Sequence, residues 1–298
     1  MPAFVSDILI AAAPLLLASL GALASERAGI LAVFSEGIIN LSAFCCFSAA
    51  VCLAQAGLPQ IPAALFAGAA AVCVCTALMY GIARFSQYTR ANYFLTALAA
   101  NALSNGLITV LSPLVYHTKG VLTSAAFQYT ALFSRVQLSC IGWLLALVCM
   151  AVYEYTKSGQ YIKICGSDAD VLAVRGISAA KWQNISWCIA AAGSACAGCI
   201  LAFRLSAFVP NISSGMGWTA LAAVFLGRRT TAGTAAAVLL FTAAQYGANN
   251  MQNISWLPSI PSAVLLAFPY LTALLFLVLS PQRGLYFRAR RRQPRRMS

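Results

Sequence analysis

Long apolar runs follow one another along almost the whole chain, and this pattern constrains the fold more than any other feature of the sequence. Hydrophobic residues make up 61% of the chain and charged residues only 8%, whereas an ordinary soluble domain carries about 25% charged residues. A soluble core cannot bury so much apolar surface, and a run of about 20 apolar residues can span a membrane as a helix. The sequence therefore predicts an all-α, polytopic transmembrane helical bundle. The runs cover residues 8–24, 38–56, 61–83, 93–111, 138–153, 185–203, 218–226, 235–248 and 263–279.

The distribution of lysine and arginine predicts which side of the membrane each loop faces. If every run crosses once and the C-terminus is cytoplasmic, only Lys119, Arg135 and Arg204 lie outside. This sorting agrees with the positive-inside rule and gives nine crossings with an outside N-terminus. The run at 218–226 is too short to span; if it is re-entrant, the count is eight. The basic residues expected inside, besides the tail at 281–298, are Arg27, Arg84, Arg90, Lys157, Lys163, Arg175, Lys181, Arg228 and Arg229.

Several other classes of function are disfavoured by the sequence. The net charge of +13 does not indicate nucleic-acid binding, because the basic residues are scattered between apolar runs and gather only in the C-terminal tail. The eleven cysteines lie almost all inside apolar runs, unlike those of a disulfide framework. His117, the only histidine, has no partner ligand nearby in sequence, and the phosphate-binding motif G-x-x-x-x-G-K-[ST] does not occur. We therefore expect no metal and no cofactor in this chain, and any energy must come from an ion gradient or a partner.

A short polar segment, GSDADVLAVRGI, interrupts the apolar pattern between 154 and 183. Ser167 and Asp170 have the spacing of a capping box, Asp168 adds a second acid to the first turn, and Gly176 is a natural stop after Arg175. The segment predicts a cytoplasmic helix of about two turns held between two spans. Its apolar residues suit a groove on a partner protein. The alternative is a helix lying on lipid, which its two acids disfavour, because anionic headgroups attract basic faces.

At these residues the chain resembles the permease subunits of ATP-binding-cassette (ABC) importers of the branched-chain amino acid, ribose and nucleoside class. GSDADVLAVRGI resembles the segment that couples such permeases to their ATPase. SERAGILAVFSEG (25–37), ANYFLTALAANAL (91–103), GWTALAAVFLGRRTTAG (217–233) and FPYLTALLFL (268–277) resemble other family segments in the same order. The likeness is greatest to the purine-nucleoside branch, chiefly through the SER-G pattern. The chain departs from that branch at Ala32, at Phe34 and after Gly227-Arg228.

The resemblance implies one permease domain over 1–298 in a bacterial cytoplasmic (inner) membrane. ATP would act on a separate ATPase subunit. Further partners would be a second, different permease subunit and an extracytoplasmic substrate-binding lipoprotein, within the lipid bilayer. The coupling segment would cover 166–176, and the tail at 281–298 would be cytoplasmic. The residues that the resemblance assigns to coupling are Gly166, Ser167, Asp168, Asp170, Leu172, Arg175 and Gly176.

Polar side chains within the spans are the candidates for the substrate pathway, because such groups are costly facing lipid. They come in pairs four residues apart, which places each pair on one helix face. Neutral amides suit an uncharged, hydrogen-bonding solute such as a nucleoside. The alternative for each amide is an interhelical hydrogen bond with no role in transport. The pairs are Glu36 with Asn40, Asn101 with Asn105, and Gln245 with Asn249.

Other functions remain open at this point. An ion-coupled secondary transporter would need ionisable groups at mid-membrane, and the spans offer almost none beyond Glu36. A membrane enzyme would need a cluster of reactive side chains, which the sequence does not suggest. Within the ABC class, a sugar or branched-chain amino acid importer is the alternative substrate assignment. Ser194 and Gly198, four residues apart in a run rich in Ala and Gly, predict a face for close helix packing.

Overall fold

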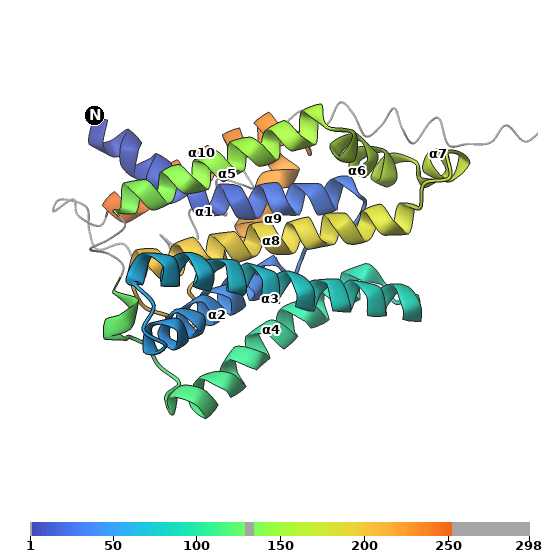
Figure 1. Cartoon of the computed structure of the whole chain (residues 1–298). Coiled ribbons are helices and arrows are strands. Elements are labelled where there is room, and N and C mark those ends of the chain that lie inside the picture. Colours follow the sequence, from blue (N-terminus) through green and yellow to red (C-terminus); the bar gives the residue numbers. More distant parts are fainter. Residues whose placement is uncertain (1, 129–133, 252–298) are drawn as a thin grey trace, which may run out of the picture. The chain divides into compact units, whose positions relative to one another are not determined.

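The computed structural model describes the backbone of residues 2–128 and 134–251, and in these ranges it is helical with no named strand (Figure 1). One isolated bridge joins Leu122 to Phe208. The chain divides into two compact units, Met1–Ala243 and Ala244–Ser298. The contacts described below lie within the first unit. The helices are α1 (Pro2–Arg27), α2 (Ser35–Gln55), α3 (Gln60–Thr89), α4 (Tyr93–Tyr116), η1 (Ala125–Phe127), α5 (Arg135–Tyr155), α6 (Lys157–Ser167), α7 (Ala169–Val174), α8 (Ala179–Leu205), α9 (Met216–Leu226) and α10 (Thr231–Met251).

Six of the described helices, α1 to α5 and α8, are long and apolar enough to cross a membrane. They coincide with the first six apolar runs, so the prediction of a helical membrane bundle is confirmed over this part of the chain. Helix α9 has 11 residues and is about 16 Å long, against a hydrocarbon core of roughly 30 Å. The run at 263–279 and the tail at 281–298 lie outside the described residues. The count of eight or nine crossings therefore stays a prediction.

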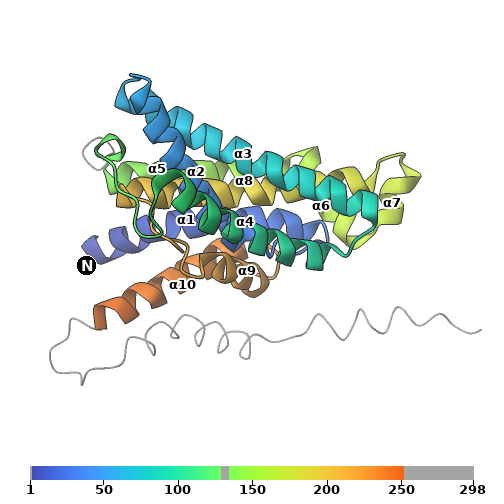
Figure 2. The same cartoon turned by 90° about the horizontal axis from the view of Figure 1, so that it is seen from below.

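Helix α8 lies at the centre of the first unit and packs along α1, α2 and α3 (Figures 1 and 2). A Cβ atom added to Gly193 would lie 2.8 Å from the carbonyl oxygen of Leu17 on α1. A Cβ added to Gly198 would overlap Ser42 and the Ile39 carbonyl on α2. Ser194 is fully buried between these glycines. The predicted close-packing face at Ser194 and Gly198 is therefore confirmed, because small residues let the backbones of neighbouring helices approach.

The connection from α8 to α9 is anchored at its start. Phe208 exchanges two backbone hydrogen bonds with Leu122, and the Leu122 nitrogen to Phe208 oxygen distance is 2.8 Å. The fully buried Phe208 ring packs edge-on against Phe44 of α2, with ring centroids 5.3 Å apart. These contacts fix the loop at 206–215 against α2. Its far end, just before α9, reaches the candidate site described below.

The segment between α5 and α8 contains two helices where the sequence predicted one. Thr156 caps α6 by accepting a hydrogen bond from the backbone nitrogen of Gly159. Helix α6 then continues to Ser167, whose hydroxyl donates to the carbonyls of Lys163 and Ile164. Ser167 is thus the last residue of α6, and the prediction that it caps the next helix is wrong. The reason is that its hydroxyl can bond within its own helix, whereas α7 starts only at Ala169, after the extended residue Asp168.

The end of α7 agrees with the sequence prediction. Gly176 has a φ of +70°, a conformation that favours glycine. The backbone nitrogen of Ile177 donates to the carbonyl of Leu172 at 2.9 Å, and that of Gly176 donates to Ala173 at 2.9 Å. This pair of bonds is the Schellman arrangement that ends many helices. The stop at Gly176 is confirmed.

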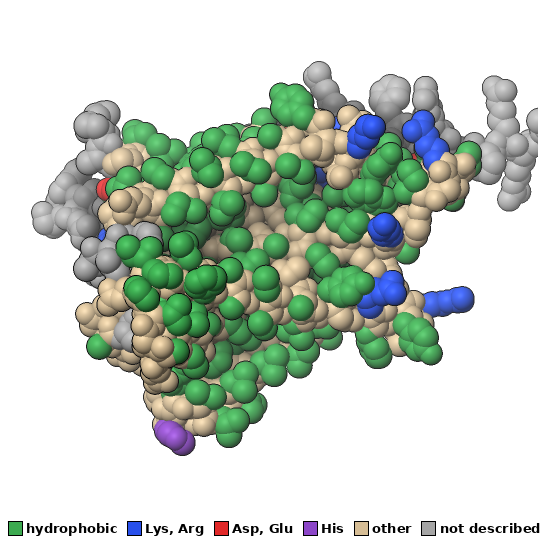
Figure 3. Space-filling model, viewed as in Figure 1, with side chains coloured by type: hydrophobic (Ala, Val, Ile, Leu, Met, Phe, Trp, Pro, Cys, Tyr) green, Lys and Arg blue, Asp and Glu red, His purple; other side chains and the backbone are tan. Residues whose placement is uncertain are grey.

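Lysine and arginine side chains gather at the end of the unit where α6 and α7 lie (Figure 3). The face shown there is otherwise largely hydrophobic along the helices. We refer to this as the basic end; among its exposed members are Arg84, Arg90, Lys157, Lys163 and Lys181.

We predict that Gly198→Ala lowers the thermal unfolding midpoint of the purified protein, because the added methyl group overlaps Ser42 and Ile39 of α2. Overpacking of this kind costs about 1–3 kcal/mol. Gly106→Ala on α4 is the matched control, since a Cβ there meets nothing within 4 Å. Thermal denaturation in detergent would measure both variants, and equal midpoints would contradict the close α2–α8 contact.

Candidate functional site

The carboxylate of Glu36 caps the N-terminus of α9. Glu36 is in the first turn of α2 and its exposure is only 7%. One carboxylate oxygen, Oε1, accepts from the backbone nitrogen of Gly215 at 2.8 Å and from the hydroxyl of Ser213. The other, Oε2, accepts from the backbone nitrogen of Gly217 at 2.7 Å. The first N–H groups of a helix have no acceptor within it and favour a negative charge. Gly215, the N-cap residue of α9, has no side chain that could accept from them. The carboxylate of Glu36, on α2, supplies the acceptor oxygens instead.

Two glycines allow this close approach. A Cβ atom on Gly217 would lie 2.6 Å from the Cα of Glu36, and one on Gly37 would lie 2.7 Å from the carbonyl oxygen of Asn101. Real Cβ atoms do not tolerate such contacts with backbone. Gly217 therefore brings α9 against α2, and Gly37 brings α4 against α2. Both glycines therefore have a packing role in the site.

The predicted amides join the same network. Asn40 accepts from the backbone nitrogen of Ser213 at 3.0 Å, and its Nδ2 donates to Asn105 Oδ1 at 3.1 Å. Asn101 Oδ1 accepts from the backbone nitrogen of Gly37 at 2.6 Å, in the first turn of α2. Asn40 is 1% exposed. Glu36, Asn40, Asn101 and Asn105 are thus brought together where α2, α4 and the loop before α9 meet.

The network leaves some hydrogen-bonding capacity unused. Asn101 and Asn105 are half-buried on α4, and each uses only its Oδ1 atom among the described residues. Their Nδ2 groups can therefore donate to another molecule. Glu36 and Asn40, by contrast, are committed to holding the loop and α9. The structure shows an interhelical role for all four side chains and leaves a substrate role as a prediction.

The remaining predicted pair, Gln245 and Asn249, lies in the second unit. Gln245 is exposed on α10. The side chain of Asn249 lies outside the described residues. Their place in a substrate pathway stays a prediction.

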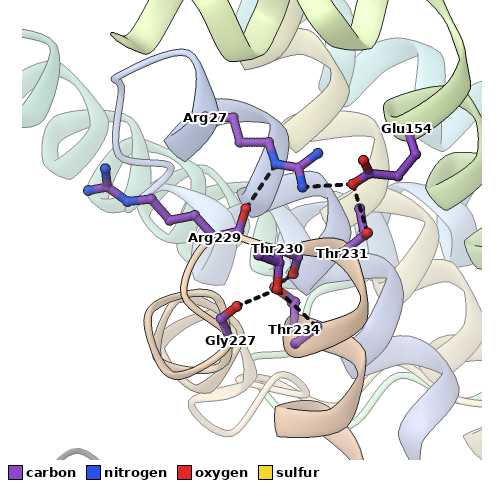
Figure 4. A network of polar contacts seen from close by, with 8 residues as sticks. Arg27, Glu154, Gly227, Arg229, Thr230, Thr231 and Thr234 are labelled. Carbon is purple, nitrogen blue, oxygen red and sulfur yellow. Dashed lines mark hydrogen bonds and ion pairs between the residues drawn. The ribbon is translucent and has the colours of Figure 1, made fainter. Parts of the chain in front are cut away.

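A second polar cluster, which the sequence did not predict as a cluster, holds the other end of α9 (Figure 4). Arg27, at the end of α1, donates through Nε to the carbonyl of Arg229 at 3.0 Å and through Nη2 to Glu154 Oε1 at 3.0 Å. The same Glu154 oxygen accepts from the hydroxyl of Thr231 at 2.8 Å. The side chain of Arg229 pairs with Glu26 at 2.5 Å. The turn at 227–231 between α9 and α10 is therefore tied to the ends of α1 and α5.

Arg27 is the central residue of this second cluster. Its side chain is 6% exposed, whereas Glu154 is 42% exposed. A buried guanidinium is stable only when its N–H groups are paired, and its fork can bond two partners at once. The polar residues of the cluster are visible in the sequence, in SERAG (25–29) and GRRTTAG (227–233). The two partners of Arg27, however, lie 202 and 127 residues away from it in sequence. Sequence reasoning had no means of pairing them.

The predicted coupling residues divide between the protein interior and its surface. Leu172 is 1% exposed and faces inward. A Cβ on Gly166 would overlap the Arg27 carbonyl and lie 2.8 Å from the backbone nitrogen of Gly29, so Gly166 joins α6 to the end of α1. Ser167, Asp168, Arg175 and Gly176 are exposed, and so is Val174, at 90%. The side chain of Asp170 lies outside the described residues.

These features describe a multi-pass α-helical membrane protein with a short helix held at both ends by polar side chains from its spans. A family model for the permease component of branched-chain amino acid transport systems matches residues 4–279. The chain therefore belongs to that family. The members of that family are permease components of transport systems.

Individual relatives are more distant. The nucleoside ABC transporter permease protein NupB of Lactococcus lactis subsp. cremoris (strain MG1363) is 30% identical over 148 residues, which is 49% of this chain and 41% of that protein. The chain thus matches less than half the length of this curated relative. Among solved structures, PsaBC from Streptococcus pneumoniae in complex with Fab is similar with a TM-score of 0.48 and 14% identity, over 96% of this chain and 95% of the other.

We predict that Glu36→Gln destabilises the protein. The amide has only one acceptor oxygen, so its NH₂ group faces one of the donors that Glu36 now accepts from. An unpaired buried donor costs about 1–3 kcal/mol. Thermal unfolding in detergent would report this as a lowered midpoint. A Glu36→Gln midpoint equal to that of the unaltered protein would argue against the cap.

Proposed function

We propose that this chain is the transmembrane permease subunit of an ABC importer and that it forms the translocation pathway for a purine nucleoside. ATP binding and hydrolysis take place on a separate ATPase subunit. The observation that carries the proposal is the family match, which extends over residues 4–279. The substrate assignment goes further than the family and rests on the chemistry of the polar network and on the nucleoside permease among its relatives.

An uncharged solute suits the network at α2, α4 and α9. The carboxylate that the described residues contribute to it, Glu36, already accepts three hydrogen bonds. The groups left to contact a solute are the neutral Nδ2 donors of Asn101 and Asn105. A purine base offers ring nitrogens that accept such bonds. A zwitterionic amino acid would bring two charges that these groups leave without counter-charges, which is costly away from water.

Coupling to the ATPase is assigned to α7. Val171 and Val174 are 45% and 90% exposed, and Arg175 beside them is exposed. A short helix with such a surface suits insertion into a groove on a partner. Leu172 secures α7 to its own subunit, because it is buried. The ATPase drives transport only if its contacts with α7 differ between the two access states of the permease.

The remaining partners follow from the importer class. The proposal places this chain in a bacterial cytoplasmic membrane with the basic end and the C-terminus on the cytoplasmic side, as the positive-inside rule predicts. A second, different permease subunit completes the pathway, and an extracytoplasmic lipoprotein delivers the solute. Asn101 and Asn105 contact the solute, while Glu36 and Asn40 position α9 beside it. Gln245 and Asn249 are assigned to the pathway on their spacing alone.

A sugar or a branched-chain amino acid is the second candidate substrate. The family to which the chain belongs includes permeases of branched-chain amino acid transport systems, and amide donors also bind sugar hydroxyls. Uptake measurements distinguish these solutes directly. An ion-coupled transporter is a separate alternative, and it predicts uptake that does not need ATP.

The substrate prediction is tested in proteoliposomes that contain the complex purified from native membranes in mild detergent. We expect ATP-dependent uptake of labelled adenosine in excess of labelled ribose or leucine. Asn105→Ala should raise the half-saturating adenosine concentration about fivefold, because one hydrogen bond contributes about 1 kcal/mol. Thr109→Ala, at an exposed position one turn further along α4, should leave it unchanged. Preferred uptake of leucine or ribose would replace the nucleoside assignment, and uptake without ATP would refute the importer.

The coupling prediction is tested with Val174→Asp, which adds a charge at an apolar side chain of α7 that is 90% exposed. A charge placed unpaired in a protein interface is strongly unfavourable, so we expect ATP-dependent uptake to fall about tenfold or more. The amount of permease in the membrane should not change. Val121→Asp, at a 55% exposed position in the loop that follows α4, is the matched control. Normal uptake by Val174→Asp would remove α7 from the ATPase interface.

A further inference from the structure

A cavity separate from the network around Glu36 lies between the C-terminal half of α3 and the N-terminal half of α8. Its volume is about 760 Å³. None of its lining residues belongs to the two polar clusters described above. The lining residues that matter below are Tyr80, Arg84 and Gln87 on α3 and Lys181, Asn184, Ile189 and Ala192 on α8.

The lining changes character along the two helices. Arg84 and Lys181 are both exposed and lie at the basic end. Ile189 and Ala192, two to three turns further along α8, are apolar. No acidic side chain is present among the described residues that line the cavity. The cavity therefore offers two cations at its outer part and an apolar wall further in.

One residue that lines the cavity, Asn184, has a buried acceptor atom with no donor among the described residues. Asn184 is 5% exposed, and its Oδ1 has no hydrogen-bond partner in the described part of the chain. The orientation of its amide is set by its neighbours, because Gln87 Nε2 donates to the Ala180 carbonyl at 2.8 Å and Gln87 Oε1 accepts from Asn184 Nδ2 at 2.7 Å. Asn184 Oδ1 is consequently left to accept from another molecule. Buried polar atoms are normally paired, so this atom is a candidate acceptor for a group of a bound molecule.

The cavity lies at the depth where lipid headgroups are expected. Helix α3 has 30 residues and a length of about 45 Å, which exceeds the hydrocarbon core of roughly 30 Å. Arg84 and Lys181 lie close to the ends of α3 and α8. Aromatic side chains mark this level as an interface: Tyr80 and Tyr88 are 50% and 89% exposed, and Tyr161 contacts Trp182 with ring centroids 5.1 Å apart.

We propose that this cavity binds an anionic phospholipid with a hydroxylated headgroup, of the phosphatidylglycerol type. Its phosphate lies between Arg84 and Lys181, and a headgroup hydroxyl donates to Asn184 Oδ1. An acyl chain follows the apolar wall formed by Ile189 and Ala192. Basic pockets between membrane helices attract anionic headgroups in this way. The site is independent of which solute the permease carries.

The proposal is tested by native mass spectrometry of the purified, delipidated complex titrated with dioleoylphosphatidylglycerol. We expect Arg84→Ala with Lys181→Ala to reduce the bound lipid about tenfold. Arg90→Ala with Lys157→Ala removes the same charge from exposed positions at the basic end that do not line the cavity, and it should retain the lipid. Equal retention by the two double variants, or equal binding of dioleoylphosphatidylcholine by the unaltered protein, would overturn the proposal.

A third variant tests the hydroxyl contact without altering charge. Asn184→Leu should lose the preference for phosphatidylglycerol over dioleoylphosphatidylmethanol, which is anionic but has no headgroup hydroxyl. An unchanged preference would remove Asn184 from the site. Glycerol 1-phosphate serves as the soluble competitor: if it displaces the lipid at equal concentration, the site is for a free anion and the lipid proposal fails. The Asn184→Leu comparison also stands if the Arg84 and Lys181 double variant does not fold.

Discussion

The hydrogen bonds from the start of α9 to the buried carboxylate of Glu36 are the interaction on which this structure depends. A helix that begins inside a membrane protein exposes N–H groups that neither lipid nor its own turns can satisfy. From α2, the two carboxylate oxygens of Glu36 accept hydrogen bonds from these N–H groups, and its negative charge lies at the positive end of the helix dipole. Gly217 makes the approach sterically possible. The short helix is therefore stable only as part of the assembled bundle.

The two polar clusters hold α9 from opposite ends and join it to the rest of the unit. Glu36 and Asn40 connect its N-terminal side to α2 and α4. Arg27 connects the turn that follows it to α1 and α5. Because Gly166 packs against the backbone at the end of α1, a continuous line of contacts runs from the α6–α7 segment through Arg27 to α9. The segment assigned to the ATPase and the helix beside the proposed solute site thus share one structural support.

Much of the fold could be predicted from hydropathy, because a span must be apolar over about 20 residues whatever its neighbours are. Helix α6 was missed because it is short and carries Lys157, Lys163 and Gln160, which give no membrane signal. Ser167 was misplaced because a serine can cap the next helix or bond within its own. In the site, the polar residues within spans could be selected from the sequence because lipid penalises them, but the contacts that they make could not. Their partners Ser213, Gly215 and Gly217 donate mostly through backbone nitrogens. Every residue except proline has such a nitrogen, so the residue types do not reveal these contacts.

The sequence by itself determined that the helices are apolar enough to lie in a lipid bilayer and where the spans are. It also determined the small-residue packing face at Ser194 and Gly198, and which polar side chains would be costly if they faced lipid. These follow from local chemistry, namely transfer free energies, side-chain size and charge. The tertiary structure alone decided what the polar groups do. Glu36 caps α9, Arg27 joins partners 127 and 202 residues away, and Asn184, which lines a cavity, has a buried acceptor with no partner among the described residues. Hydrogen bonds between segments distant in sequence depend on distance and direction in space, and these exist only once the helices have packed.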